Sequence, residues 1–445
     1  MSLTTLRRGW GGYAAPLLTL ATPVIASQAS SMLVNLADTL MVGWLGDVPL
    51  AAVSFAGNLS VPFMFFGIGA AATITPLVGR RLGRGQTSEL GHVVAHARAF
   101  NWRIVALQLV LLTVLDFLMP YMGQPAEVVK IAQWYLPIYT ASLIGQQMFV
   151  CSRTIIEGLQ DTTSPMIVGL GCNVLNIGLN YLFIFGIGSY EGIGVYGAAV
   201  STLICRTLMW IVMEIILRRR LRKLGVMPQR SQGHNITSRL FKMGLPMGLQ
   251  SIIETLGFAF AGIMMGWIST EAIAAHQVVN AFTSTTFLMV GGLATAITIK
   301  VSHNTGAGNK LEARRYAITG ITMGAAFMCL TAILFYFTRY SLPGLIINGE
   351  EALRIAADLM LMGAIFQVFD GIQASALGAL RGYADFNYPA RVAAISYAAT
   401  CSPVGYICAF WLGMGPSGIW CGLIAGLGLA AILLLLRLRK RYWSF

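Results

Sequence analysis

Residues 417–436 read SGIWCGLIAGLGLAAILLLL, a stretch without a single charged side chain. A helix of about 20 apolar residues is long enough to cross the hydrocarbon core of a bilayer. The rest of the chain has the same character, because 56% of its 445 residues are hydrophobic and only 11% are charged. We therefore expect an all-α protein whose solvent is a membrane rather than water.

Similar apolar stretches recur along the whole chain, separated by short polar segments. They predict twelve transmembrane helices, at residues 14–44, 50–79, 99–122, 131–152, 165–189, 194–217, 243–268, 273–300, 316–338, 353–380, 390–412 and 417–436. A protein of this kind is in contact with the lipid bilayer over most of its surface.

The net charge of +13 is unevenly distributed among the connecting segments. Lys and Arg lie before the first helix, after every second helix and in the C-terminal tail, whereas the other segments are mostly acidic. The positive-inside rule then predicts a multi-pass inner-membrane protein with both termini in the cytoplasm. The most basic segment, 218–242, is interpreted as a solvated cytoplasmic connector, although a patch for nucleic acid or anionic lipid is the alternative. We expect no nucleic-acid partner.

An internal repeat divides the chain in two. A shift of 223 positions aligns Pro23 with Pro246, and a G-x-x-D-x-x-x-P motif occurs at both 158–165 and 382–389. Two six-helix halves that enter from the same side are related by an axis along the membrane normal, a common design of transporters. The predicted domains are an N-lobe at 1–217, the connector at 218–242 and a C-lobe at 243–445. Pro23 and Pro246 are either hinges or tolerated kinks.

Two carboxylates of the predicted C-lobe lie where a membrane disfavours charge. Glu254 is about eleven residues into its helix, which places it roughly 16 Å deep, and Asp370 lies at a similar depth in residues 353–380. If the two helices adjoin, the acids share a pocket that can exchange a proton or hold a monovalent cation. The alternative is a pair of neutral acids within a polar core.

The predicted N-lobe has a different set of polar residues. Asp38 lies in the first helix with Asn35 one turn earlier, and Asn176 and Asn180 share one face of a later helix. A carboxylate with amide oxygens suits a proton or a hard cation, although Asn also joins packed membrane helices. Thr202 is ambiguous.

Several other polar residues are given no transport role. Arg206 and Glu214 are spaced to pair with each other or with Asp116, which favours a structural interpretation. His92 and His96 have metal-ligand spacing but lack a third ligand. No phosphate-binding GxxxxGK[ST] motif and no catalytic constellation occurs in the sequence, which argues against ATP hydrolysis and against an enzyme. No cofactor is expected beyond Na⁺ or H⁺ as a coupling ion.

The sequence resembles the multidrug and toxic compound extrusion (MATE) family, and within it the NorM-type branch. The resemblance covers essentially the whole chain, and its most specific parts are residues 37–43, 176–186, 245–254, 274–277 and 366–373 with 380–383. It implies a V-shaped antiporter of twelve helices that expels organic cations in exchange for Na⁺ or H⁺ by alternating access. We expect such a transporter to function as a monomer.

The resemblance also implies where the coupling ion binds. Glu254 and Asp370 match the coupling acids of the C-lobe, while Asp38, Asn176 and Asn180 match an acidic site of the N-lobe, and Thr202 lies near a further position of that site. One departure is Phe366, where some NorM-type members have Tyr, so a hydroxyl ligand is missing while the aromatic ring remains. A lipid-linked precursor flippase of the same superfamily is the alternative function, and a passive channel is a third.

Overall fold

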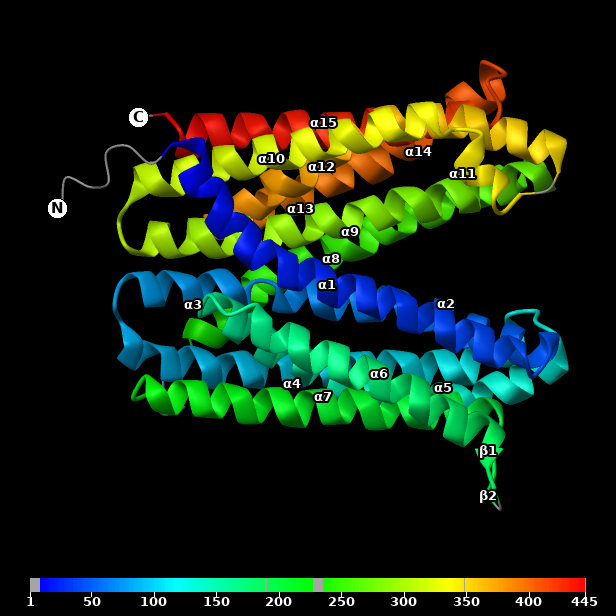
Figure 1. Ribbon diagram of the computed structural model, residues 1–445, viewed down its shortest axis with the longest axis horizontal. Coiled ribbons are helices and arrows are strands. Elements are labelled where there is room, and N and C mark those ends of the chain that lie inside the picture. Colours follow the sequence, from blue (N-terminus) through cyan, green and yellow to red (C-terminus); the bar gives the residue numbers. More distant parts are fainter. Residues whose placement is uncertain (1–8, 189, 227–234, 348, 445) are drawn as a thin grey trace. The chain divides into compact units, whose positions relative to one another are not determined.

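The computed structural model describes residues 9–188, 190–226, 235–347 and 349–444, most of them in long helices (Figure 1). The first half of the chain forms α1 (Trp10–Gly43), α2 (Asp47–Ala71), α3 (Ile74–Gly83), α4 (Thr87–Leu118), α5 (Ala126–Gly158), α6 (Thr163–Phe185) and α7 (Val195–Lys223). A 3-10 turn follows α4 at Met119–Tyr121. A short antiparallel hairpin, β1 (Gly186–Ile187) and β2 (Tyr190–Glu191), separates α6 from α7.

The second half repeats this order, except that α9 is continuous where α2 and α3 are separate and that the helix after α12 is broken. It forms α8 (Asn235–Gly266), α9 (Thr270–Gly306), α10 (Lys310–Phe337), α11 (Ser341–Gly344), α12 (Glu350–Gly382), α13 (Asn387–Ala393), α14 (Ser402–Tyr406) and α15 (Pro416–Tyr442). Two π-helical segments, Ala394–Cys401 and Ile407–Trp411, flank α14. Every one of the twelve predicted spans coincides with a helix or a broken helix, so the predicted fold class is confirmed. Arg7 and Arg8, and residues 227–234 of the connector, lie outside the described residues.

Helix α5 is the least lipid-like of the predicted spans. Eleven helices of the described chain are long and apolar enough to cross a membrane, and α5 is not one of them. It packs against α2, α3, α4 and α7 and is buried over most of its length, where Gln147 donates to Asn101 Oδ1 at 2.7 Å and to the Gly67 carbonyl at 3.0 Å. A helix surrounded by protein can carry polar side chains when they are paired.

Packing divides the described chain into two compact units. The N-unit contains residues 26–248, and the C-unit contains residues 9–25 and 249–444. The boundaries fall between Ile25 and Ala26 and between Gly248 and Leu249, just after Pro23 and Pro246. The boundaries from packing therefore differ from those of the repeat at α1 and α8. The first half of α1 packs with the helices of the C-unit, and the first half of α8 packs with the helices of the N-unit.

The contacts of these two half-helices show why they belong where they do. In the C-unit, Leu17 of α1 lies in a buried cluster with Ile297 and Leu380. In the N-unit, the ring of Phe241 on α8 meets Phe100 edge-on at 4.9 Å between centroids. A proline inside a helix removes a backbone hydrogen bond, so both helices can bend where they pass from one unit to the other.

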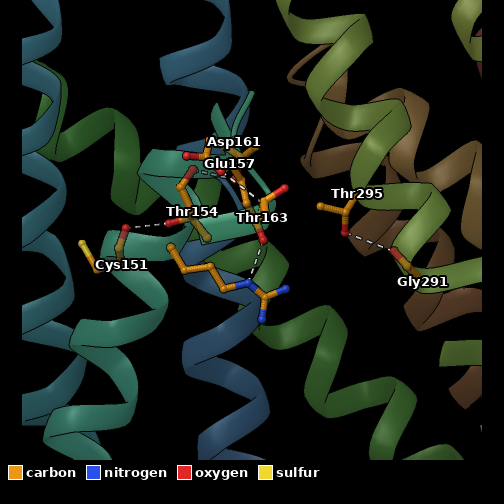
Figure 2. A network of polar contacts seen from close by, with 9 residues as sticks. Cys151, Thr154, Glu157, Asp161, Thr163, Gly291 and Thr295 are labelled. Atoms are coloured by element: carbon orange, nitrogen blue, oxygen red, sulfur yellow. Dashed lines mark hydrogen bonds and ion pairs between the residues drawn. The ribbon is translucent and has the colours of Figure 1, made fainter. Parts of the chain in front are cut away.

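The repeated turn keeps its backbone conformation in both halves. Gln160 and Ala384, each one residue before the Asp of the motif, have positive φ angles of 65° and 50°. Asp161 of the first turn accepts hydrogen bonds from the backbone N–H groups of Thr163 at 3.1 Å and Ser164 at 3.0 Å. Figure 2 shows Asp161 and Thr163 in this turn. Asp161 thereby satisfies two of the free donors at the start of α6.

The aspartate of the second turn holds the C-terminal helix instead. Asp385 accepts hydrogen bonds from Arg437 Nε at 2.9 Å and from the Tyr442 hydroxyl at 3.1 Å. The Tyr442 ring also stacks on Tyr383, with 4.3 Å between ring centroids. The basic end of α15 is therefore fixed to the C-unit.

We predict that Gly145→Ala destabilises the N-unit. A Cβ at Gly145 would lie 2.7 Å from the Arg206 carbonyl carbon and 2.8 Å from the Thr207 nitrogen, because α5 and α7 approach backbone to backbone there. Separating the two helices should cost about 1–3 kcal/mol. The matched control is Gly171→Ala in α6, where a Cβ meets nothing within 4 Å. Thermal melting in detergent should fall for Gly145→Ala alone; equal melting of the two variants would contradict the close approach.

Candidate functional site

Both acids predicted for the C-lobe lie inside the C-unit. Glu254 lies in the middle of α8 and is half-buried, and Asp370 lies on α12 and is 5% exposed. Their carboxylates are close enough to interact electrostatically. Two carboxylates that share a buried position repel each other, so a proton or a cation between them is favourable.

Three further side chains complete what we call the C-unit acid cluster. Gln250, one turn before Glu254, donates a hydrogen bond to its Oε1 at 2.9 Å. The guanidinium of Arg381 interacts electrostatically with Glu254, and its buried Nε has no hydrogen-bond partner among the described residues. Tyr397 faces both acids. The cluster thus offers carboxylate, amide and phenol oxygens together with one fixed positive charge.

Arg381 and Tyr397 were not expected at this site. Arg381 follows the predicted span 353–380 and was expected in a connecting segment, but it lies in the last turn of α12. Tyr397 belongs to the first π-helical segment, where the backbone is wider than in an α-helix. Such wide turns often occur at functional sites, and this one places a phenol next to the acids.

An aromatic cluster lies beside the acids. Phe366, predicted as an auxiliary site residue, is 3% exposed, and its ring packs edge-on against Phe258 at 6.1 Å and Trp420 at 5.6 Å. The ring of His276 also packs against Trp420, with 5.9 Å between ring centroids. Phe366 therefore belongs to the aromatic packing of the C-unit, and its ring has no oxygen that could bind an ion.

A pocket of about 440 Å³ opens between α8 and α9 of the same unit. Phe258 and Gly262 line it from α8, and His276, Gln277 and Asn280 line it from α9. The buried Nδ1 of His276 has no hydrogen-bond partner among the described residues. The pocket therefore combines an aromatic face with amide and imidazole groups, and Phe258 joins it to the aromatic cluster.

The N-unit has its own acid cluster, which we define as Asp38, Asn176, Asn180, Ser201 and Arg206. The amide of Asn180 donates hydrogen bonds to Asp38 Oδ1 and, at 3.3 Å, to Asn176 Oδ1. The hydroxyl of Ser201 donates to Asn180 Oδ1. Helices α1, α6 and α7 thus converge on one chain of polar contacts that ends at the carboxylate.

Two of the residues predicted for this region lie outside the cluster. Asn35 is exposed, one turn before Asp38 on α1. Thr202 donates its hydroxyl to the Ala198 carbonyl of its own helix, at 2.8 Å. The adjacent Ser201 faces Asn180 instead, since successive residues of an α-helix point about 100° apart.

We predict that Ser201→Ala weakens transport and stability more than Thr202→Val. Ser201→Ala leaves the buried Asn180 oxygen without its donor, which costs about 1–3 kcal/mol, whereas Thr202→Val removes only a bond to the backbone of the same helix. Melting temperature and the initial rate of efflux measure the difference. A larger effect of Thr202→Val would place Thr202 in the site and remove Ser201.

Arg206 has contacts different from those expected. Its guanidinium lies 4.8 Å above the ring of Tyr139 and donates to Ser142 Oγ at 2.8 Å. Of the two pairings considered, with Glu214 or with Asp116, neither occurs among the ion pairs of the described residues, and Glu214 Oε1 lies 2.6 Å from Arg98 and 2.8 Å from Arg218. Arg206 interacts electrostatically with Asp38 instead.

His92 and His96, whose spacing alone resembles that of metal ligands, belong to no group of metal ligands within the described chain. His96 Nδ1 lies 2.7 Å from the hydroxyl of Thr237 on α8. Across the described residues, no three His, Cys, Asp or Glu side chains come together as metal ligands.

Two repeated units of membrane-spanning helices, each with a buried carboxylate cluster, define a class of protein: a polytopic transporter. The comparisons agree with this class. The family model described as MatE matches residues 23–182 and 246–407. The chain belongs to the MatE family, whose named members are transporters rather than enzymes.

Curated relatives and solved structures match over nearly the full length. The chain is 30% identical to the multidrug resistance protein NorM of Aliivibrio fischeri over 434 residues, covering 95% of this chain and 93% of the relative. It is 30% identical to the NorM of Photobacterium profundum over 431 residues, covering 95% and 94%. The Vibrio cholerae MATE transporter VcmN in the bent form shares the fold, with a TM-score of 0.86, 21% identity and 98% coverage of both chains.

The chain also matches a solved structure in an outward-facing conformation. An outward-facing multidrug resistance MATE transporter of the MOP superfamily matches with a TM-score of 0.88, 19% identity and 96% coverage of both chains. At these identities the solved structures establish the fold, while the NorM relatives and the family model establish the family. The resemblance inferred from the sequence is confirmed.

Proposed function

We propose that this protein is a secondary active multidrug efflux antiporter that exports organic, mostly cationic amphipathic compounds in exchange for Na⁺ or H⁺. The observation that carries the proposal is the pairing of Glu254 and Asp370 within the C-unit. Relatives at 30% identity named multidrug resistance proteins support the choice of substrate class. We place the protein in the bacterial inner membrane, as a monomer with both termini in the cytoplasm.

The acid clusters provide the step that couples ion to drug. A buried carboxylate is costly when charged and alone, so binding of a proton or Na⁺ favours one arrangement of the surrounding helices over another. One charge that moves through 100 mV releases about 2.3 kcal/mol, which shifts a two-state equilibrium by about 50-fold. Prolines at the unit boundaries in α1 and α8 allow the helices to bend as this equilibrium shifts.

The pocket between α8 and α9 is our candidate for part of the drug site. Its volume suits the aromatic portion of a drug, and the face of Phe258 attracts organic cations. Gln277 is exposed and Asn280 is half-buried, so their amides can orient polar substituents. Phe258 also packs against Tyr397 at 6.1 Å, which joins the pocket to the acid cluster.

The experiment that tests the proposal is efflux of a fluorescent organic cation from proteoliposomes under an imposed Na⁺ or pH gradient. Export that follows one of the gradients would support antiport and identify the ion. Export in folded protein that ignores both gradients would overturn ion coupling, and ion flux without drug would favour a passive channel.

A lipid-linked precursor flippase is less well supported. Such a protein needs a positively charged cavity for a diphosphate, whereas the C-unit acid cluster contains two carboxylates for its one arginine. Transfer of labelled lipid diphosphate across the same liposomes, together with absence of drug movement, would reverse this preference.

A further inference from the structure

Arg206 is a charged residue far from either end of its helix. It lies eleven residues after Val195, the first residue of α7, and therefore about 16 Å along the helix. A guanidinium at that depth in a membrane protein is costly unless it is paired or solvated. None of the ion pairs among the described residues includes Arg206, in contrast to Arg98 on α4, which pairs with Glu214 at 2.6 Å.

The guanidinium of Arg206 donates its hydrogen bonds to uncharged side chains, and such contacts are weaker than an ion pair. One nitrogen donates to Ser142 Oγ at 2.8 Å and another to the Tyr139 hydroxyl at 3.3 Å, while the plane lies over the Tyr139 ring. These contacts leave part of the donor capacity of the guanidinium unused, since it carries five N–H groups. The arrangement holds the charge near α5 without neutralising it.

Asp38, from α1 of the same unit, is an acid that acts electrostatically on this charge. Asp38 is half-buried and hydrogen-bonded to Asn180, and it interacts electrostatically with Arg206. Tyr135 on α5 and Cys205 on α7 also act on the carboxylate, with Tyr139 next to Tyr135 and Cys172 next to Cys205. The polar groups of the cluster are Asn176 and Asn180 on α6 and Ser201 on α7. Among the described residues that act on Asp38, Arg206 is the one with a permanent positive charge.

We propose that Arg206 is a tethered counter-charge for Asp38. When Asp38 carries its coupling ion, the guanidinium keeps the contacts with Tyr139 and Ser142 described above. When the ion leaves, the guanidinium swings toward the bare carboxylate and forms an ion pair with it. Arg206 is thus a positioning residue that competes with the coupling ion, an idea that rests on the antiport function proposed above.

The competition has a consequence for ion affinity. A fixed positive charge near the carboxylate opposes the arrival of Na⁺ or H⁺ and assists its release, which an antiporter needs in order to turn over. Neutralising Arg206 should therefore tighten ion binding at Asp38. A side chain with only a structural role would change stability without changing ion affinity.

The test uses the purified full chain in lipid nanodiscs and measures its melting temperature against Na⁺ concentration and, separately, against pH. In Arg206→Gln, the half-saturating concentration of Na⁺ or H⁺ should fall at least about tenfold, since a unit charge that opposes ion binding at the carboxylate is removed from a partly buried environment. Arg206→Lys should stay near the wild type. The matched control is Arg103→Gln on α4, whose guanidinium lies over the Phe241 ring at 5.8 Å.

The double variant Arg206→Gln with Asp38→Asn decides whether the effect passes through Asp38. The shift in half-saturation should vanish there. The proposal is overturned if folded Arg206→Gln has unchanged or weaker ion dependence, or if the shift persists without the carboxylate. The melting experiment does not require transport. Absence of gradient-driven efflux in the wild type would therefore count against the proposed function, whereas the ion dependence of melting would still test the role of Arg206.

Discussion

Asp370→Asn and Glu254→Gln should each reduce gradient-driven drug export about fiftyfold, to the level of passive leak. The estimate is the equilibrium bias that one charge gains in 100 mV, about 2.3 kcal/mol. Both substitutions keep the shape of the side chain but remove its ability to exchange an ion. Gln at position 254 can still pair with Gln250, so the C-unit should remain folded.

Asp358→Asn is the matched control for these variants. Asp358 lies on α12 with Asp370 but is exposed. Its replacement removes the same carboxylate oxygen and the same charge from the same helix, and efflux should stay within about twofold of the wild type, as is usual for exposed positions. Full gradient-driven export by Asp370→Asn or Glu254→Gln would remove the C-unit acids from the coupling step.

Most of the fold could be predicted because a membrane imposes a simple rule on the sequence. Each span needs about 20 mostly apolar residues, and the stretches that satisfy this rule coincide with helices of the structure. The broken helix after α12 was predicted as one span, since hydropathy does not report hydrogen-bond spacing. Pro403, which has no backbone N–H, lies between its two π-helical segments.

The division into compact units could not be predicted from the repeat. Pro23 and Pro246 were recognised as equivalent, but the sequence does not reveal which neighbours the residues before them contact. The buried position of Leu17 beside Ile297 and the ring contact of Phe241 with Phe100 decide this. Packing partners separated by hundreds of residues leave no periodic signal in a single sequence.

Candidate site residues that lie one helical turn apart in the sequence were the easiest to assign to the same site. Asn176 and Asn180 are one turn apart on α6, and their shared face was evident before the structure. Ser201 and Arg381 had no such signal, because their roles depend on Asn180 and Glu254 of other helices. Their only sequence cue was a polar side chain inside or next to an apolar stretch.

Asp38→Asn is expected to lower the initial rate of gradient-driven efflux by at least about tenfold, the effect of losing ~1.4 kcal/mol of differential ion binding. The new amide oxygen can still accept the hydrogen bond that Asn180 donates to Asp38, so the N-unit should fold. A neutral amide cannot release a proton or balance the charge of Na⁺, and it also leaves Arg206 without an acid to face.

Two variants separate this effect from a general sensitivity of the first helices. Asp47→Asn makes the same chemical change at an exposed position at the start of α2, and Asn35→Ala removes the exposed amide one turn before Asp38. Both should transport within about twofold of the wild type. If Asn35→Ala matches Asp38→Asn, the site extends to the exposed face of α1; if Asp38→Asn transports normally, coupling depends on the C-unit acids alone.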